Sequence, residues 1–226
     1  MSLQDVVVIW LDGTFVGDNY RSMKDDFNQK LGSTTSSSSS DEIDCLICKE
    51  TKEDLVINGA PVITVSKSDE AMQQIETHSK AKIFFISSGR LGKDMVPTIV
   101  RQYPLIHSFY IFCFDMATHG NWALDYTNCL KMFDHPIDLL VRLMRDISTY
   151  FTEQGKLYLK FNDPNNALKY FKYAWNLETR ANQKDKVPPN TKSKEKPTVQ
   201  PDCRTRLNLL EGENGLIRQA EKALGK

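Results

Sequence analysis

Residues suited to binding an anion follow one apolar segment of this 226-residue chain, in the stretch SSGRLGK. Ser87, Ser88 and Gly89 come directly after the apolar run, and Gly92 and Lys93 lie a few residues further on. Glycines at the start of a helix leave backbone N–H groups open to an anion, and a nearby lysine adds positive charge. The stretch is therefore a candidate site for phosphate or a similar anion.

The same stretch departs from the loop that holds nucleotide phosphates in P-loop proteins. Only two residues separate Gly89 from Gly92, and Asp94 stands where that loop carries the Ser or Thr that binds magnesium. A tight strand-to-helix turn also needs glycine for its backbone conformation. An ordinary turn is the simpler interpretation, and we predict no cofactor.

Three aspartates, Asp12, Asp115 and Asp134, end apolar runs in the chain. If the runs are strands of one sheet, the carboxylates could converge and hold a divalent cation such as magnesium. Aspartate is also a common first residue of helices and turns, which is the interpretation we favour. We keep Asp12 and Asp115 as candidate ligand-binding residues and predict no metal site.

Cysteines and histidines add two weaker candidates. Cys45 and Cys48 have CxxC spacing, but no second CxxC or histidine pair follows at the spacing of a zinc site. His119 and His135 come after apolar runs and could act as a general acid or base. His135 precedes Pro136, which is typical of a helix start. No Ser, His and Asp arrangement indicates a triad, so we predict no catalytic residue.

The elements that would position these residues are five apolar segments separated by amphipathic ones. Residues 5–11 and 82–86 are apolar on both faces, which is typical of parallel strands covered by helices. Strands that alternate with helices predict a doubly wound, five-stranded parallel α/β sheet, in which ligands bind at the carboxyl ends of strands. Its size is typical of a flavodoxin-like or receiver-like domain. The other predicted strands are residues 61–65, 107–114 and 130–133.

The first 145 residues resemble a known receiver-like domain in the segments KIFFISSGRLGKDMVPTIV, HSFYIFCF and HGNWALDY. The resemblance is to the amino-terminal domain of certain invertebrate multidomain proteins, where it precedes tetratricopeptide repeats or an arginine-specific ADP-ribosyltransferase domain. It implies no activity. Ser87 stands where a bacterial receiver has its phosphoaccepting aspartate, and Asp12 is a single carboxylate rather than a pair. We therefore predict no phosphoryl acceptance.

Residues 148–181 resemble the 34-residue tetratricopeptide unit, a hairpin of two helices. Small residues of that unit let the helices approach, and aromatic residues fill the space between them. Phe151 replaces the usual tryptophan, and Thr179 replaces the closing proline. Residues 162–164 are expected in the turn. The motif residues are Gly155, Tyr158, Ala167, Phe171 and Ala174.

The chain divides into four predicted parts: a receiver-like α/β domain (1–146), a tetratricopeptide-like hairpin (147–181), a flexible linker (182–202) and an amphipathic, broken C-terminal helix (203–226). Within the first part, the serine-rich residues 33–40 predict a mobile loop. Residues 41–60 contain CLIC and DLVIN, which could form a short hairpin. A single repeat leaves helical faces uncovered, so we expect the last helix or a protein partner to cover them.

Composition narrows the choice of partners. The chain has 29 basic and 29 acidic residues, so no excess of positive charge indicates nucleic acid or an anionic membrane surface. No apolar run approaches the roughly 20 residues of a membrane span, and the start has no basic leader, so we predict a cytoplasmic protein.

We expect a non-catalytic interaction or signalling scaffold whose hairpin binds a helix or peptide and whose C-terminal helix can self-associate. Two alternatives remain. One is a small enzyme or sensor that binds a phosphate or nucleotide ligand at the strand ends. The other, implied by the resemblance, is the regulatory part of an arginine ADP-ribosyltransferase without its catalytic domain.

Overall fold

The structure, a computed structural model, describes residues 6–13, 53, 55–103, 106, 108–185 and 202–225. The expected serine-rich loop, the CxxC segment and residues 186–201 of the expected linker lie outside the described residues. The chain forms two compact units, Met1–Leu139 and Leu140–Lys226. This division, like the predicted boundary after residue 146, falls within one continuous helix, α7 (Pro136–Lys160).

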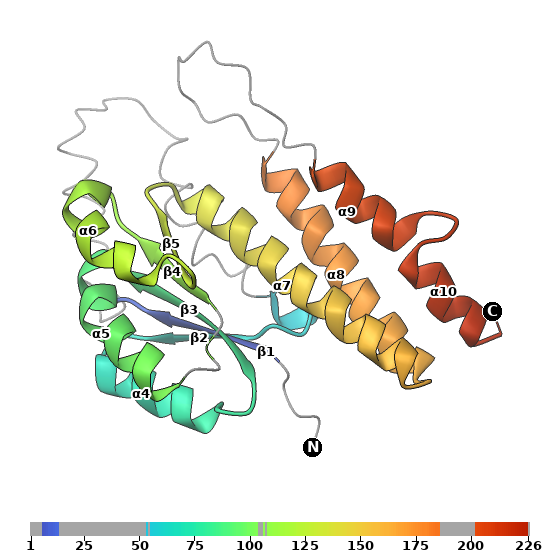
Figure 1. The fold of residues 1–226 in the computed structure, drawn as a ribbon, viewed down its shortest axis with the longest axis horizontal. Coiled ribbons are helices and arrows are strands. Elements are labelled where there is room, and N and C mark those ends of the chain that lie inside the picture. The colour runs from blue at the N-terminus through green and yellow to red at the C-terminus, as the bar shows by residue number, and fades with distance from the viewer. Residues whose placement is uncertain are drawn as a thin grey trace, which may run out of the picture. The chain divides into compact units, whose positions relative to one another are not determined.

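A five-stranded, all-parallel sheet forms the centre of the first unit, in the order β2-β1-β3-β4-β5 (Figure 1). The prediction of five parallel strands is confirmed, and this order is that of flavodoxin-like sheets. Leu11 pairs with Ser87 and Ser88 pairs with Phe112, so the carboxyl ends of β1, β3 and β4 lie side by side. The strands are β1 (Val6–Leu11), β2 (Val62–Val65), β3 (Lys82–Ser88), β4 (Ser108–Phe112) and β5 (Leu130–Phe133).

Three helices cover one face of the sheet (Figure 1). Ile9 and Phe85 from the strands pack in one buried cluster with Ile75 and Val96 from two of the helices. Val8 is next to Ile9 in β1, so its side chain faces the opposite side of the sheet, and it is buried as well. Because both faces of this strand are covered, its residues are apolar on both faces. Between β1 and β2, residues 14–52 and 54 lie outside the described residues. The three helices are α4 (Ser68–Thr77), α5 (Gly89–Gln102) and α6 (Met116–Ala123), the last followed by the 3₁₀ turn η2 (Leu124–Tyr126).

The segment DLVIN is not a strand, because residues 55–57 are helical. The backbone N–H groups of Gly59 and Ala60 donate to the carbonyls of Val56 and Leu55, at 3.1 and 2.8 Å. Leu55 is buried, and the other two apolar residues of the turn are exposed. The expectation of a hairpin is wrong here because a short apolar run suits a helical turn as well as a strand.

Helices make up the described part of the second unit (Figure 1). Helix α8 (Pro164–Asp185) lies between α7 and the last two helices, α9 (Asp202–Glu211) and α10 (Leu216–Ala223), which pack on α8 and on each other. The predicted break of the C-terminal helix is present between Glu211 and Leu216. Helix α8 continues to Asp185, so the first residues of the expected linker are helical. None of the described helices is both long and apolar enough to span a membrane.

Candidate functional site

The first candidate site lies where the strand order reverses, at the ends of β1 and β3, which is where open α/β sheets bind ligands. Ser87 is fully buried, and its hydroxyl donates to the carbonyl of Ser88 at 3.1 Å. Helix α5 begins at Gly89, and the side chain of Ser88 makes no capping hydrogen bond there. Lys93 is exposed on the next turn of α5.

The two glycines of the turn have a packing reason. A Cβ on Gly89 would lie 2.6 Å from Cδ2 of His119 and 2.9 Å from Cβ of Cys113. A Cβ on Gly92 would lie 2.6 Å from Cδ1 of Ile111. Neighbouring side chains therefore occupy the space that any larger residue would need, which favours a packed turn over a loop built for phosphate. The expected reason, backbone conformation, is not the one observed, because neither glycine has a positive φ.

His119 lies against the start of α5. Trp122 donates its indole N–H to Nδ1 of His119 at 3.3 Å, so the neutral ring carries its proton on Nε2. Nε2 lies 2.7 Å from the position of a Cβ on Gly89, which places this donor beside the first turn of α5. The sequence indicates His119 as a candidate. Its bond from Trp122 is a contact within α6, whereas its contact with Gly89 joins two separate helices and cannot be read from spacing.

Asp115 is the N-cap of α6. Its carboxylate accepts hydrogen bonds from the backbone N–H of Thr118, at 3.1 Å, and from the Thr118 hydroxyl. The bond from the Thr118 side chain, followed by the one from its backbone, holds the pKa of Asp115 below its usual value of 3.8. Asp12, Asp115 and Asp134 are all described, and no group of three or more such residues could hold a metal ion in the described part of the chain.

No nucleophile is paired with a base among the strand-end residues named above. Burial, followed by the charges of Asp115 and Asp134, raises the pKa of the Cys113 thiol, which stays protonated at neutral pH. The Ser87 hydroxyl donates to a carbonyl and not to His119. Asp12 is half-buried, and its backbone N–H donates to Val65 at the end of β2. The arrangement offers a packed turn rather than an assembled reaction centre.

The second candidate site is the hairpin of α7 and α8. A Cβ on Gly155 would lie 2.6 Å from Cδ1 of Phe171, so the glycine lets the Phe171 ring lie against α7. The Ser148 hydroxyl donates to the backbone carbonyl of Ala174 at 2.9 Å, which also requires close helices. Ala167, Phe171 and Ala174 are fully buried. The small residues of the predicted motif therefore lie where the two helices approach.

Aromatic rings fill the rest of the space between these helices. Tyr158 of α7 stacks on Tyr170 of α8, with ring centroids 5.2 Å apart. Phe151, at the position where the repeat usually has tryptophan, meets Tyr170 edge to face at 5.6 Å. At the turn, Asp163 accepts a hydrogen bond from the backbone N–H of Asn166 at 3.1 Å and thereby caps α8.

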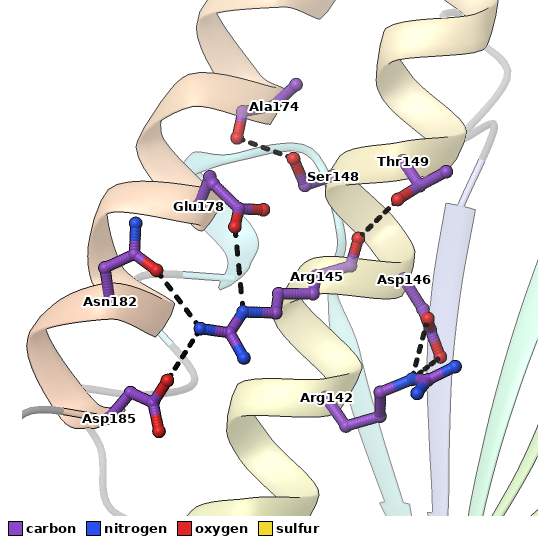
Figure 2. A network of polar contacts seen from close by, with 9 residues as sticks. All are labelled: Arg142, Arg145, Asp146, Ser148, Thr149, Ala174, Glu178, Asn182 and Asp185. Atoms are coloured by element: carbon purple, nitrogen blue, oxygen red, sulfur yellow. Dashed lines mark hydrogen bonds and ion pairs between the residues drawn. The ribbon is translucent and has the colours of Figure 1, made fainter. Parts of the chain in front are cut away.

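A polar network that sequence reasoning missed joins α7 to α8 away from the turn (Figure 2). Arg145 of α7 extends toward α8, where it contacts Asp185 at 2.7 Å, Asn182 at 3.2 Å and Glu178 at 3.6 Å. Only 1% of the Glu178 side chain and 12% of the Arg145 side chain are exposed. A buried carboxylate is costly without a cationic partner, so the network favours one register of the helices.

One signal in the sequence could have revealed this network. Arg145 and Glu178 each interrupt a run of residues that are apolar at helical spacing, and a charge at such a position needs a partner. The sequence does not say which residue that partner is, because the pairing depends on how two separate helices pack.

The last two helices cover part of α8, and we call residues 202–225 the tail. Leu210, Leu216 and Ala220 of the tail are buried, and the indole N–H of Trp175 on α8 donates to the Glu211 carboxylate. Two other apolar residues of the tail, Leu207 and Ile217, are only half-buried. A shallow groove remains beside α10, lined by residues that include Lys172, Trp175, Ile217 and Arg218.

No family model, curated protein or solved structure matches this chain. The resemblances to the receiver-like domain and to the tetratricopeptide unit therefore rest on their motif residues alone.

Proposed function

We propose that this protein is a non-catalytic interaction module whose helical unit binds an amphipathic helix of a partner protein. The observation that supports this proposal is that one such segment, the tail, already packs on α8. Leu210 and Leu216 of the tail are buried, and Trp175 of α8 donates a hydrogen bond to Glu211. A surface that holds an amphipathic helix by a few apolar anchors and one polar contact is a common mode of helix recognition.

In this proposal the α7–α8 hairpin acts as a single tetratricopeptide-like repeat. Its support is the position of the motif residues between the helices, with Gly155 against Phe171 and with Tyr158 stacked on Tyr170. The interior of the hairpin is then occupied by its own side chains, which leaves outer surfaces such as that of α8 for recognition.

The alternative of an enzyme or sensor at the strand ends has less support. Gly89 and Gly92 are explained by the side chains packed against them, and Asp115 is explained as a helix cap. The Cys113 thiol is held protonated by burial and nearby carboxylates. The observed contacts therefore give more support to the interaction module than to an enzyme or sensor.

A peptide-binding experiment tests the proposal on the full-length chain. The double substitution Leu216→Asp and Ala220→Arg should release the tail, because both side chains are buried and belong to α10, which packs on α8. A labelled peptide of residues 202–226 should then bind this variant with micromolar affinity, measured by fluorescence anisotropy. Wild type should bind about tenfold or more weakly, because its own tail occupies the surface in most molecules.

Two further substitutions in the released variant provide a test of the contact and its control. Trp175→Phe removes the indole N–H that bonds Glu211, together with part of the aromatic ring, and should weaken peptide binding about 2- to 10-fold. Leu157→Ala, at an exposed position of α7, should leave binding unchanged. If the released variant keeps its helical circular dichroism but binds no peptide, the proposed binding surface is wrong.

A further inference from the structure

The two helices of the tail form one structural element that depends on packing against α8. Helix α9 has 10 residues and α10 has 8, fewer than the roughly 12–15 that an isolated helix needs to be stable in water. The turn between them is tight: the Gly215 N–H donates to the carbonyl of Gly212, and a Cβ on Gly215 would lie 2.5 Å from the carbonyl oxygen of Leu210. Packing on α8 therefore orders the tail, and the two helices dock and leave together.

Few side chains hold the tail on α8. Among the tail residues whose burial is described, the buried apolar side chains are those of Leu210, Leu216 and Ala220. The indole of Trp175 adds one hydrogen bond, to Glu211 on the exposed side of α9. A contact with so few anchors can open without unfolding of the hairpin, whose interior is formed by other residues.

The connection between α8 and the tail does not determine whether the tail packs on α8 of its own chain or on α8 of a neighbouring copy. Residues 186–201 link the two, and a fully extended chain of this length spans about 55 Å. Packed helices lie only about 8–10 Å apart. The sequence of this connection is rich in lysine and proline and poor in apolar residues. Its length allows the tail to reach α8 of its own chain or of a neighbouring copy.

We propose that the tail is exchanged between two copies of this chain, so that α9 and α10 of each copy pack on α8 of the other. This inference rests on the proposed function, because it uses the same helix-binding surface of α8. A second copy is the occupant that this surface fits, since its tail repeats every contact of the intramolecular one, including those of Leu216 and the pair Trp175–Glu211. Exchange of identical elements is a low-cost route to a dimer.

Concentration decides between the two arrangements. Because a short connection tethers the tail to its own α8, the effective concentration of the tail there is of the order of millimolar. The closed monomer is therefore the main form in dilute solution. Reciprocal exchange becomes dominant where copies are concentrated or held together on a common assembly.

Two full-length variants make exchange directly visible. Trp175→Asp places a carboxylate opposite Glu211, and Glu211→Lys places an ammonium opposite Trp175, so each variant alone has a mismatched contact in both the closed and the exchanged form. In a mixture, an exchanged heterodimer pairs the new carboxylate with the new ammonium and restores one Trp175–Glu211 pair. The dimer fraction, measured by native mass spectrometry with one variant isotope-labelled, should be several-fold higher in the mixture than in either variant alone.

A second charge-reversal pair provides the control. Lys156→Asp and Glu153→Lys alter an exposed ion pair on α7 that is separate from the tail contact, and their mixture should form no more dimer than each variant alone. Mixed labelled and unlabelled wild type at near-millimolar concentration should also yield a dimer, and the released variant Leu216→Asp/Ala220→Arg should not. This wild-type measurement does not depend on the folding of the charge-reversed variants.

The outcomes separate this inference from the proposed function. No heterodimer in the Trp175→Asp and Glu211→Lys mixture, or equal dimer formation by the released variant, overturns exchange. If the tail peptide still binds the released variant, the helix-binding surface stands while exchange is rejected. If the peptide does not bind, both fail.

Discussion

At the scale of single residues, the absence of a side chain has different consequences at different glycines. Gly89, Gly92 and Gly155 each lie against another side chain that occupies the position of a Cβ. Gly120, inside α6, has open space at the same position. A methyl group should therefore lower the stability of the protein at the three crowded glycines and leave it unchanged or raise it at Gly120, even though each glycine lies in a helix.

Gly155→Ala should destabilise the helical unit by about 1–3 kcal/mol, because the new methyl group overlaps the Phe171 ring and the helices must move apart. Gly120→Ala is the matched control and should be neutral or stabilising by up to about 1 kcal/mol, because alanine is the better helix former. Urea denaturation followed by circular dichroism measures both. Stabilisation by Gly155→Ala would mean that the close approach of α7 and α8 is not required.

At the scale of elements, α7 and α8 are joined by two kinds of contact. Near the turn, apolar and aromatic residues such as Tyr158 and Tyr170 fill the interface. Further from the turn, Arg145 and Glu178 form a largely buried pair (Figure 2). Apolar packing tolerates small shifts of register better than a buried ion pair does, since a displaced partner leaves a charge without compensation.

Arg145→Met should cost about 3–5 kcal/mol of unfolding free energy, because it leaves the buried Glu178 carboxylate without its cationic partner. Adding Glu178→Leu should recover most of that loss, since an apolar pair of similar volume removes the buried charge. Arg142→Met, at the exposed pair with Asp146, is the control and should cost no more than about 0.5 kcal/mol. Additive losses for Arg145→Met and Glu178→Leu in a double-mutant cycle would contradict a coupled pair.

At the scale of the whole molecule, the chain contains two compact units that differ in secondary structure. The first has a parallel sheet with small, closely packed turns, and the second has a helical hairpin with the tail on α8. Cys113 belongs to the first unit, where it is buried at the end of β4. Its thiol can therefore report on the sheet unit alone, whereas the helical signal comes from helices of both units.

We predict that Cys113 is labelled slowly by thiol reagents in the native protein, because it is buried and its pKa is raised, first by burial and then by Asp115 and Asp134. Gly155→Ala, which lies in the second unit, should lower helical stability without accelerating this labelling. Mass spectrometry of the Cys113 peptide after timed labelling provides the measurement. Faster labelling in that variant would show that the two units open together.

Patterns within short segments predicted much of this protein. Val6–Leu11 and Lys82–Ser88 are strands because their residues are apolar on both faces, and a strand with two covered faces is a local property of the chain. Gly155 and Phe171 lie at the spacing that a close helical hairpin requires. Both patterns can be read because secondary-structure periods are short.

Contacts between distant segments were decided only by the tertiary structure. Spacing does not show that the His119 ring lies against Gly89, that Arg145 pairs with Glu178, or that Trp175 bonds Glu211. Each of these contacts joins separate helices, or a helix and a turn, whose relative position depends on packing of the whole unit. The sequence alone therefore determined which segments form strands and helices, and the tertiary structure decided which side chains meet, since packing is not a property of any single segment.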